Sequence, residues 1–378
     1  MISLEDFFDR IQFQLDNKLP FVMYKKPEEE IIHAVPQNDD TLNEVKDYTE
    51  SGFVFSPFNN AKKAPIILPI SNSKPISTFF IESEMYNTSE KDVTENLHYP
   101  LRKIDHIGII QKALEEINSG KLQKVIISRT EKIDIKDDNV MTLFKKLINT
   151  YFTAFVYLWY HPKVGMWMGA TPETLIKVDG NKFKTIALAG TQPFLGNMEV
   201  EWGDKEIEEQ QMVVNSIIEN LKEQSTALRV SEKFTVKAGN ILHLQTNISG
   251  VIENLNSDDN QNEIQYLINA LHPTPAVCGL PKEEAKQFIL DNENYDREFY
   301  TGFLGELNIP SYNKKNDDEE NLDSNNIVSN IYVNLRCMKI MNKKAVIYIG
   351  GGITKDSDVE NEWQETVNKT KVMKKVLF

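Results

Sequence analysis

Two pairs of glutamates with the same spacing have the residue types and positions for metal chemistry. Glu206 and Glu209 form one pair, and Glu362 and Glu365 form the other. Residues three apart share one face of a helix, and Mg²⁺ prefers carboxylate oxygens together with water and an anionic ligand. The spacing therefore predicts a magnesium site shared by two helices. The alternative is that the glutamates only decorate the exposed faces of two helices.

Both pairs lie in segments with helical patterns. Apolar residues recur at the helical period over 212–221, directly after the first pair. Around the second pair, Val359 and Trp363 are four residues apart, and Ser357 and Glu360 have the spacing of a capping box. Each glutamate pair is therefore expected near the start of a helix.

The bulk composition narrows the class of protein. The chain has 378 residues, 40% of them hydrophobic, which is enough for a large core in one domain or two. Its net charge of -14 and pI near 5.1 argue against nucleic acid or an anionic membrane as the main partner. An anionic small substrate stays possible, because a metal ion and a few basic residues can set the field inside a cleft.

Cysteine content and apolar patterning indicate the compartment. Cys278 and Cys337 are the only cysteines, so a disulfide framework is not expected and the compartment is predicted to be reducing. Residues 1–20 resemble an acidic amphipathic helix and not a signal peptide. No run approaches the roughly 18 consecutive apolar residues of a membrane span. These features predict a cytoplasmic protein.

The coarse pattern interleaves helices and strands without βαβ regularity. A helix is expected over 104–117, ended by Gly120, and an acidic solvated insertion over 313–326. The expected strands are 125–127, 151–160, 164–168, 183–188, 234–249, 331–340 and 345–349.

Short motifs occur in a fixed order along the chain. They are found at 124–129, 169–175, 189–191, 206–209, 243–246, 271–279, 335–336, 348–353 and 362–365. This ordered set resembles the chorismate-utilising enzymes, which include isochorismate synthase, salicylate synthase and the large subunits of anthranilate and aminodeoxychorismate synthases. Each motif alone would be weak, and their order is what carries the resemblance.

The resemblance implies a fold, a substrate and a cofactor. The fold is of the α+β class, a large two-lobed antiparallel β-sandwich flanked by helices with the site in the central cleft. One domain is expected over 1–378, with 1–103 as a variable N-terminal part and 104–378 as the motif-bearing catalytic region. The implied substrate is chorismate, and the implied cofactor is Mg²⁺.

Two positions resemble the isochorismate synthases within this family. One is the motif at 271–279, and the other is Ala189, where aminodeoxychorismate synthases carry a nucleophilic lysine. The implied reaction is the Mg²⁺-dependent interconversion of chorismate and isochorismate, by water addition at C2 and loss of the C4 hydroxyl, for menaquinone or siderophore synthesis. Gln210, where histidine is usual, and Cys278, where glycine or serine is common, depart from the family pattern.

The catalytic pair implied by the resemblance consists of Lys124 and Glu173. Lys124 would be the general base for water and must be neutral to act, so burial or neighbouring cations have to lower its pKa. Glu173 would be the general acid and needs a raised pKa. A solvated lysine at a strand start and an exposed hairpin glutamate are the alternatives.

The remaining roles are also implied by the resemblance. Glu209 and Glu365 would be direct Mg²⁺ ligands, with Glu206 and Glu362 in the outer shell. Arg336 would bind the enolpyruvyl carboxylate, because its guanidinium can donate two parallel hydrogen bonds. The other expected substrate contacts are Gly190, Thr191, His243, Tyr300, Gly350, Gly352 and Lys369.

Two of these substrate contacts have bland alternatives. Lys369 could form a plain surface ion pair with Glu365, four residues before it. A lone histidine such as His243 often has a structural role. His272, between a leucine and a proline, is expected to be architectural.

Other functions are considered against the same residues. The glycines at 350–352 precede a helix but lack the further residues of a Rossmann fingerprint or a P-loop. No zinc-ligand spacing or nucleophile elbow occurs. A salicylate synthase and a catalytically silent chorismate- or Mg²⁺-binding protein remain as alternatives. The family resemblance implies no glutaminase subunit and a monomer or weak dimer.

Overall fold

Two antiparallel β-sheets with helices around them form the protein. The computed structural model describes residues 1–80, 99–135, 139–222, 225–238, 241–252, 262–310 and 327–377. Every strand pairing in these residues is antiparallel. The predicted α+β class with a large antiparallel sandwich is therefore confirmed. The predicted acidic insertion at 313–326 lies outside the described residues.

The first sheet has nine strands in the described part of the chain. In spatial order they are β15 (Gly279–Leu280), β7 (Lys124–Asp134), β19 (Lys344–Ile353), β18 (Cys337–Met341), β9 (Gly165–Thr171), β8 (Phe155–His161), β1 (Phe21–Lys25), β2 (Ile31–Pro36) and β6 (Ile76–Phe79). Strands from the beginning, middle and end of the sequence are therefore neighbours in one sheet.

The second sheet has ten strands among the described residues. Its order is β12 (Ser225–Val230), β14 (Ile241–Ile252), β11 (Lys182–Pro193), β10 (Thr174–Asp179), β17 (Ile327–Val333), β16 (Phe303–Pro310), β4 (Gly52–Ser56), β5 (Ile66–Pro69) and β3 (Asn43–Glu44), and β13 (Phe234–Ala238) also pairs with β14. Residues 1–80 thus contribute strands to both sheets.

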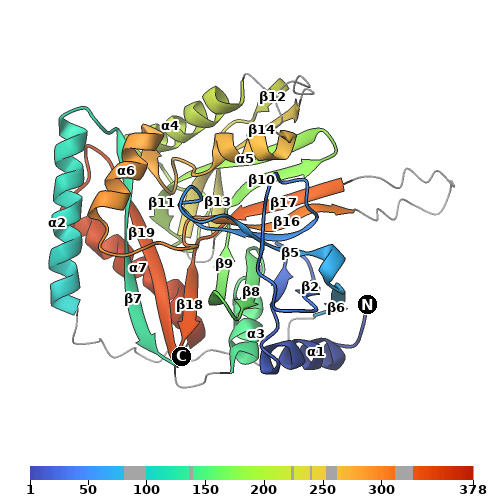
Figure 1. Ribbon diagram of the computed structural model, residues 1–378. Coiled ribbons are helices and arrows are strands. Elements are labelled where there is room, and N and C mark those ends of the chain that lie inside the picture. The colour runs from blue at the N-terminus through green and yellow to red at the C-terminus, as the bar shows by residue number, and fades with distance from the viewer. Residues whose placement is uncertain are drawn as a thin grey trace.

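Helices cover the outer faces of the two sheets (Figure 1). They are α1 (Leu4–Asp16), α2 (Tyr99–Asn118), α3 (Val140–Thr150), α4 (Asp204–Leu221), α5 (Glu263–Leu271), α6 (Lys282–Asn292) and α7 (Val359–Leu377), with a 3₁₀ turn at Ile70–Asn72. α4 packs against β11 of the second sheet, and α7 packs against β19 of the first. The two glutamate pairs therefore come from helices on different sheets.

Aromatic side chains fill the space between the sheets. Phe155 of the first sheet stacks on Tyr332 of the second, with ring centroids 4.2 Å apart. Phe55 of the second sheet stacks on Phe299, in the loop before β16, at 4.2 Å and also contacts Trp159 of the first sheet, with ring centroids 4.9 Å apart. Such pairs add about 0.5–1.5 kcal/mol to the free energy gained from burial, so this layer fixes the sheets relative to each other.

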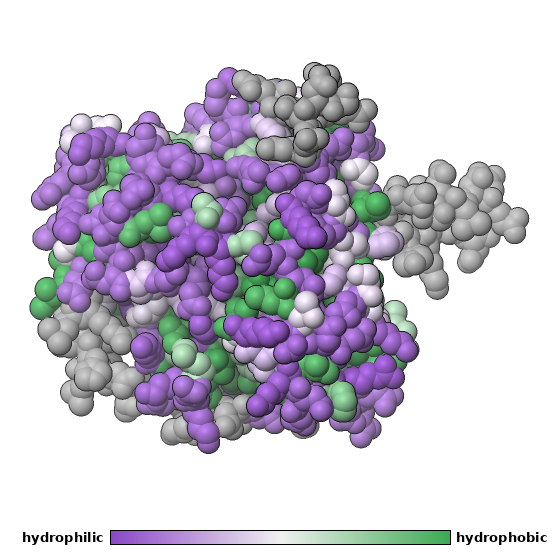
Figure 2. Space-filling model, in the orientation of Figure 1, coloured by the Kyte–Doolittle hydropathy of each residue, from purple (hydrophilic) through white to green (hydrophobic). Residues whose placement is uncertain are grey.

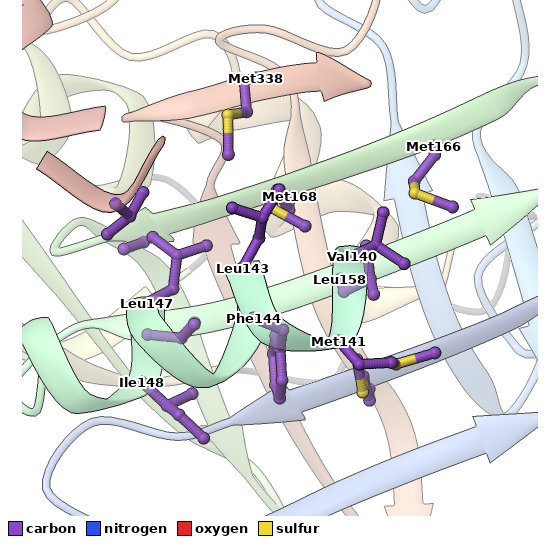
Figure 3. Packing of buried hydrophobic residues seen from close by; sticks show 14 of the residues in the cluster. Val140, Met141, Leu143, Phe144, Leu147, Ile148, Leu158, Met166, Met168 and Met338 are labelled. Atoms are coloured by element: carbon purple, nitrogen blue, oxygen red, sulfur yellow. The ribbon is translucent and has the colours of Figure 1, made fainter. Parts of the chain in front are cut away.

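A second core lies on the outer face of the first sheet, under α3 (Figure 3). Val140, Phe144 and Leu147 of the helix pack toward Leu158 and Met168 of the sheet. The sequence analysis did not predict α3, and it started the following strand at residue 151. Tyr151 instead caps α3, and β8 begins at Phe155. An aromatic residue between two apolar segments fits either element, which explains the error.

Two other predicted strands are each divided in the structure. The segment 234–249 forms parts of β13 and β14, which pair with each other. The segment 331–340 contains the end of β17 in the second sheet and most of β18 in the first. Arg336 lies at this crossing between sheets with φ of 45°. Because hydrophobicity continues through the crossing, the pattern alone did not reveal it.

The surface in the view of Figure 2 is mostly hydrophilic, with apolar side chains in small groups. Among the described residues, no helix combines the length and apolar character that crossing a membrane would require.

Candidate active site

One pocket brings together every residue that the sequence analysis assigned to the site. Its walls come from β7, β11, β14, β19, α4, α7 and the turn between β9 and β10. The assigned residues that line it are Lys124, Glu173, Gly190, Thr191, Glu206, Glu209, His243, Tyr300, Arg336, Gly350, Gly352, Glu362, Glu365 and Lys369. Both sheets and both glutamate-bearing helices are needed to build this pocket.

Lys124 is buried at the start of β7 and paired with a glutamate of α4. Its side chain is 1% exposed, and its Nζ donates to Glu209 Oε1 at 2.6 Å. Burial alone would raise the pKa of Glu209, but the charge and hydrogen bond of Lys124 outweigh burial and hold this pKa below its usual value. The alternative of a solvated surface lysine is therefore wrong.

Glu173 is buried in the turn between β9 and β10, where it is 5% exposed. Burial raises its pKa to about 7, against the opposing influence of Lys124, Thr274 and Arg336. Thr274 Oγ1 donates to Glu173 Oε1 at 3.5 Å. The exposed-hairpin alternative is wrong, and the carboxyl has a pKa suited to donating a proton near neutral pH.

Glu362 of α7 is the most buried of the four clustered glutamates. Its Oε1 accepts hydrogen bonds from Ser357 Oγ at 2.6 Å and Lys205 Nζ at 3.5 Å. Its Oε2 is buried, with no hydrogen-bond partner among the described residues. Burial and the neighbouring Glu365 raise the pKa of Glu362. Oε2 of this buried carboxylate therefore lacks a donor among the described residues, whereas Oε1 has two.

The start of α7 corrects one local prediction. Asp358, and not Ser357, caps the helix, because Asp358 Oδ1 accepts from Asn361 N at 2.9 Å. The Ser357 hydroxyl instead donates to Glu362, as described above. The capping-box interpretation of Ser357 and Glu360 was therefore wrong, although the helix itself is present.

The glycines of β19 show that glutamates from the two helices border one surface. A Cβ atom at Gly351 would lie 3.7 Å from Glu362 Oε2 and 4.0 Å from Glu365 Oε1. A Cβ atom at the next residue, Gly352, would lie 3.3 Å from Glu209 Oε1. Carboxylates of α4 and α7 therefore flank adjacent positions of the same strand.

Lys369 and Tyr300 lie beside Gly350 of the same strand. Lys369 Nζ is 2.5 Å from Glu365 Oε1 and donates to Gly350 O at 3.1 Å. A Cβ atom at Gly350 would approach the Tyr300 hydroxyl oxygen to 2.8 Å, so a larger residue there would require the Tyr300 side chain to move. The ion pair between Lys369 and Glu365 that was considered as an alternative is therefore present, and the same lysine also contacts β19 at the pocket.

Arg336, His243 and Gly190 form a polar group at another part of the pocket. His243 Nδ1 lies 2.8 Å from Gly190 O, which can only accept, so this nitrogen carries the proton. His243 Nε2 is then the acceptor for Arg336 Nη2 at 3.3 Å. Burial and Arg336 lower the pKa of His243 to about 4. The histidine is neutral at physiological pH and holds the guanidinium in place.

Thr191 is a polar neighbour of this group, whereas His272 is not. Thr191 Oγ1 is 3.5 Å from His243 Nδ1. His272 lies away from this group, where its Nε2 is 3.2 Å from Thr301 O, and burial lowers its pKa to about 3. His272 does not line the pocket, which agrees with its expected architectural role.

Lys205 also lines the pocket and was not predicted from the sequence. Lys205 precedes Glu209 by four residues on α4, so both point to the same side of the helix. That spacing was available in the sequence and would have placed Lys205 in the site.

The glutamate cluster fits a hard cation through its chemistry. No three His, Cys, Asp or Glu side chains in the described ranges are already arranged as a ligand set, and lysines pair with three of the four clustered carboxylates. The donors are nevertheless all carboxylate oxygens, which Mg²⁺ prefers, and the buried Glu362 Oε2 has no partner among the described atoms. The residues present therefore fit magnesium.

Comparisons with known proteins identify the family. A family model described as chorismate binding enzyme matches residues 76–378. The isochorismate synthase MenF of Haemophilus influenzae is 26% identical over 269 residues, which are 69% of this chain and 57% of that protein. The isochorismate synthase EntC of Escherichia coli K12 is 30% identical over 278 residues, 70% of this chain and 65% of that protein. The chain thus matches less than two thirds of the length of either relative.

A solved structure shares the fold over the whole chain. The menaquinone-specific isochorismate synthase MenF of Escherichia coli superposes with a TM-score of 0.75 at 20% identity, covering 100% of this chain and 93% of that one. At this identity the similarity concerns the fold alone.

Proposed function

We propose, from the premise that this chain belongs to the chorismate-binding enzyme family, that it is a Mg²⁺-dependent isochorismate synthase. The observation that carries the proposal is the presence of buried Lys124 and Glu173 in one pocket, the latter with its pKa raised to about 7. A base and an acid in a single pocket are what the addition of water at one carbon and the loss of a hydroxyl from another require.

The reaction exchanges one water molecule for another. The ammonium of Lys124, paired with Glu209 in this structure, must first release a proton to solvent. As the amine, Lys124 then takes a proton from water while the oxygen of that water bonds to C2 of chorismate. The ring double bonds shift, the C4–O bond breaks, and Glu173 donates its proton to the departing hydroxyl. Chorismate and isochorismate have the same composition, so no oxidant or reductant is consumed.

The glutamates of α4 and α7 support the metal part of the proposal. Glu209 and Glu365 would ligate Mg²⁺ directly, with Glu206 and Glu362 in its outer shell. When bound, the ion would orient the ring carboxylate of chorismate and neutralise its charge. The partnerless Oε2 of Glu362 and the carboxylates that flank Gly351 and Gly352 support this arrangement.

Substrate orientation is assigned to the other part of the pocket. Arg336 would bind the enolpyruvyl carboxylate, with its guanidinium held by the neutral His243. Tyr300 and the main chain of Gly350 and Gly352 would contact the same arm of the substrate. Lys369 would support the metal carboxylates, because it already contacts Glu365.

Water is assigned as the nucleophile because the residue before Gly190 has only a small, unreactive side chain. Ala189 lines the pocket where a lysine nucleophile would be expected in an aminodeoxychorismate synthase. The proposed enzyme consists of one domain and works without a glutaminase subunit. It would be a monomer or weak dimer in the cytoplasm. Menaquinone or siderophore synthesis would consume the product.

A product assay tests the proposal. The purified protein is incubated with chorismate, with and without Mg²⁺ and with added ammonium, and the products are separated by chromatography. Isochorismate that forms only with Mg²⁺ is the expected result. Salicylate with pyruvate would identify a salicylate synthase, anthranilate would identify an amination activity, and unchanged chorismate would indicate a silent binding protein.

A further inference from the structure

Three lysines serve as positive partners of the clustered glutamates. Lys124 pairs with Glu209, Lys369 pairs with Glu365, and Lys205 Nζ lies 3.5 Å from Glu362 Oε1. Each of these carboxylates therefore has a cation supplied by the chain itself. A metal ion that binds the cluster must compete with these cations for the same oxygens.

The three lysines differ in how easily they can leave. Lys124 is 1% exposed and has its short contact of 2.6 Å inside the protein. Lys369 is 29% exposed, contacts its glutamate at 2.5 Å and also donates to Gly350 O. Lys205 is 40% exposed and has the longest contact of the three, 3.5 Å. Lys205 can therefore move into solvent with the least loss of interactions.

Lys205 also connects the two halves of the cluster. It belongs to α4, as Glu206 and Glu209 do, and its partner Glu362 belongs to α7. Glu362 is 5% exposed, so its charge is costly without a cation nearby. A cation at this place holds the two helices together across the pocket.

On these grounds we infer that Lys205 is an exchangeable stand-in for the metal ion, which neutralises Glu362 until Mg²⁺ binds and thereby sets the Mg²⁺ concentration at which the site fills. Lys205 is a positioning residue and performs no step of the reaction. The inference rests on the proposed magnesium site and adds to it a residue that opposes metal binding.

Calorimetric titration with MgCl₂ alone tests the inference. Lys205→Met removes the charge and keeps much of the side-chain volume, so the Kd for Mg²⁺ is expected to fall by about fivefold at low salt. Lys205→Arg keeps a cation and is expected to have an affinity close to that of the unmodified protein. Lys103→Met is the matched control. Lys103 pairs at 2.6 Å with Glu360, which belongs to α7 as Glu362 does, and this pair lies outside the pocket.

Thermal unfolding provides a second measurement. Without the stand-in charge, Lys205→Met is expected to have a lower Tm than the unmodified protein in EDTA. Saturating Mg²⁺ is expected to remove this difference, because ligand binding stabilises the folded state by RT ln(1 + c/Kd), where c is the free Mg²⁺ concentration, and the variant has the lower Kd. A merely structural lysine would lower the Tm equally with and without Mg²⁺.

The outcomes separate the inference from the proposed function. If the unmodified protein binds Mg²⁺ and Lys205→Met binds it equally or more weakly, the stand-in role is overturned and the metal site remains. If the unmodified protein releases no heat and gains no stability with Mg²⁺, the proposed metal site itself is overturned.

Discussion

Glu173 and Glu209 are carboxyl groups of the same pocket, the first buried and the second partly buried, yet their pKa values shift in opposite directions. Burial raises the pKa of both. Glu173 lies in the turn between β9 and β10, where the neighbouring groups lower its pKa less than burial raises it, and its pKa is about 7. Glu209 instead has Lys124 Nζ at 2.6 Å, and its pKa is lowered. One short ion pair therefore decides which of the two carboxyl groups has a raised pKa and which has a lowered one.

The largest expected effect on catalysis comes from replacing Lys124, the lysine that pairs with Glu209 and not with Glu173. Lys124→Met should lower kcat by about 10³-fold, since positioned acid–base groups contribute about 10²–10⁴-fold. Initial rates of isochorismate formation measure the loss, and calorimetry with chorismate and Mg²⁺ checks that substrate still binds. A variant with a near-normal rate would remove Lys124 from its role as the base.

The next largest effect is expected at Glu209. Glu209→Gln in EDTA should lower the free energy of unfolding by about 3 kcal/mol at pH 8, because it leaves the buried Lys124 charge without its anion. A carboxyl with a lowered pKa contributes stability above its unfolded pKa, and that contribution is lost as the pH falls. Urea unfolding at pH 8 measures the loss of stability in the variant, and urea unfolding at pH 4 measures how much of this difference remains. Equal stability of variant and parent at pH 8 would contradict the ion-pair account.

The corresponding change at Glu173 should have the opposite sign. Because folding raises its pKa from 4.5 to about 7, the charged form costs stability above pH 4.5, fully above pH 7. Glu173→Gln should therefore raise the free energy of unfolding by about 3 kcal/mol at pH 8 and change it little at pH 4. Urea unfolding of this variant beside Glu209→Gln tests the contrast, and destabilisation at pH 8 would break it.

The same titration predicts a pH profile for the unmodified enzyme. The acid must be protonated, so kcat/KM should decline as the pH rises through about 7. His243, with a pKa of about 4, should not contribute to this decline. A rate that stays constant from pH 6 to 9 would separate Glu173 from the acid step.

A smaller effect is expected for the other proposed metal ligand. Glu365→Gln should weaken Mg²⁺ binding by about 100-fold, because a neutral amide replaces a charged oxygen donor. Calorimetry with MgCl₂ measures it, with Glu360→Gln as the control from the exposed side of the same helix. An unchanged Kd would refute the assignment of Glu365 as a ligand.

The residues that the sequence assigned to one site all line one pocket, whereas several predicted strand boundaries were wrong. The motif residues are spread along the chain from Lys124 to Lys369, and each was placed by its motif, so none depended on knowing where a strand ends. The pairing partners were not predictable in the same way. That Lys124 faces Glu209 follows from the packing of α4 near β7 and β19, which no local pattern in the sequence records.

The fold errors have a common physical cause. The class was available from the resemblance, and the first helix of the motif region from its periodicity, but 331–340 was taken as one strand. This segment leaves the second sheet and enters the first at Arg336, whose positive φ turns the chain. Hydrophobicity reports burial and not the sheet in which a residue is buried, so it could not detect the change.

Residues 350, 351 and 352 of β19 are all glycines, but they differ in how much space a larger side chain would have. An added methyl group at residue 350 would collide with the Tyr300 hydroxyl, and one at residue 352 would crowd Glu209 and Lys124. Gly351 has only ordinary contact distances, 3.7 Å and 4.0 Å, to Glu362 and Glu365. Gly351 is therefore the position where an engineer could introduce a small side chain against the carboxylates, to tune access to them while the backbone keeps its path.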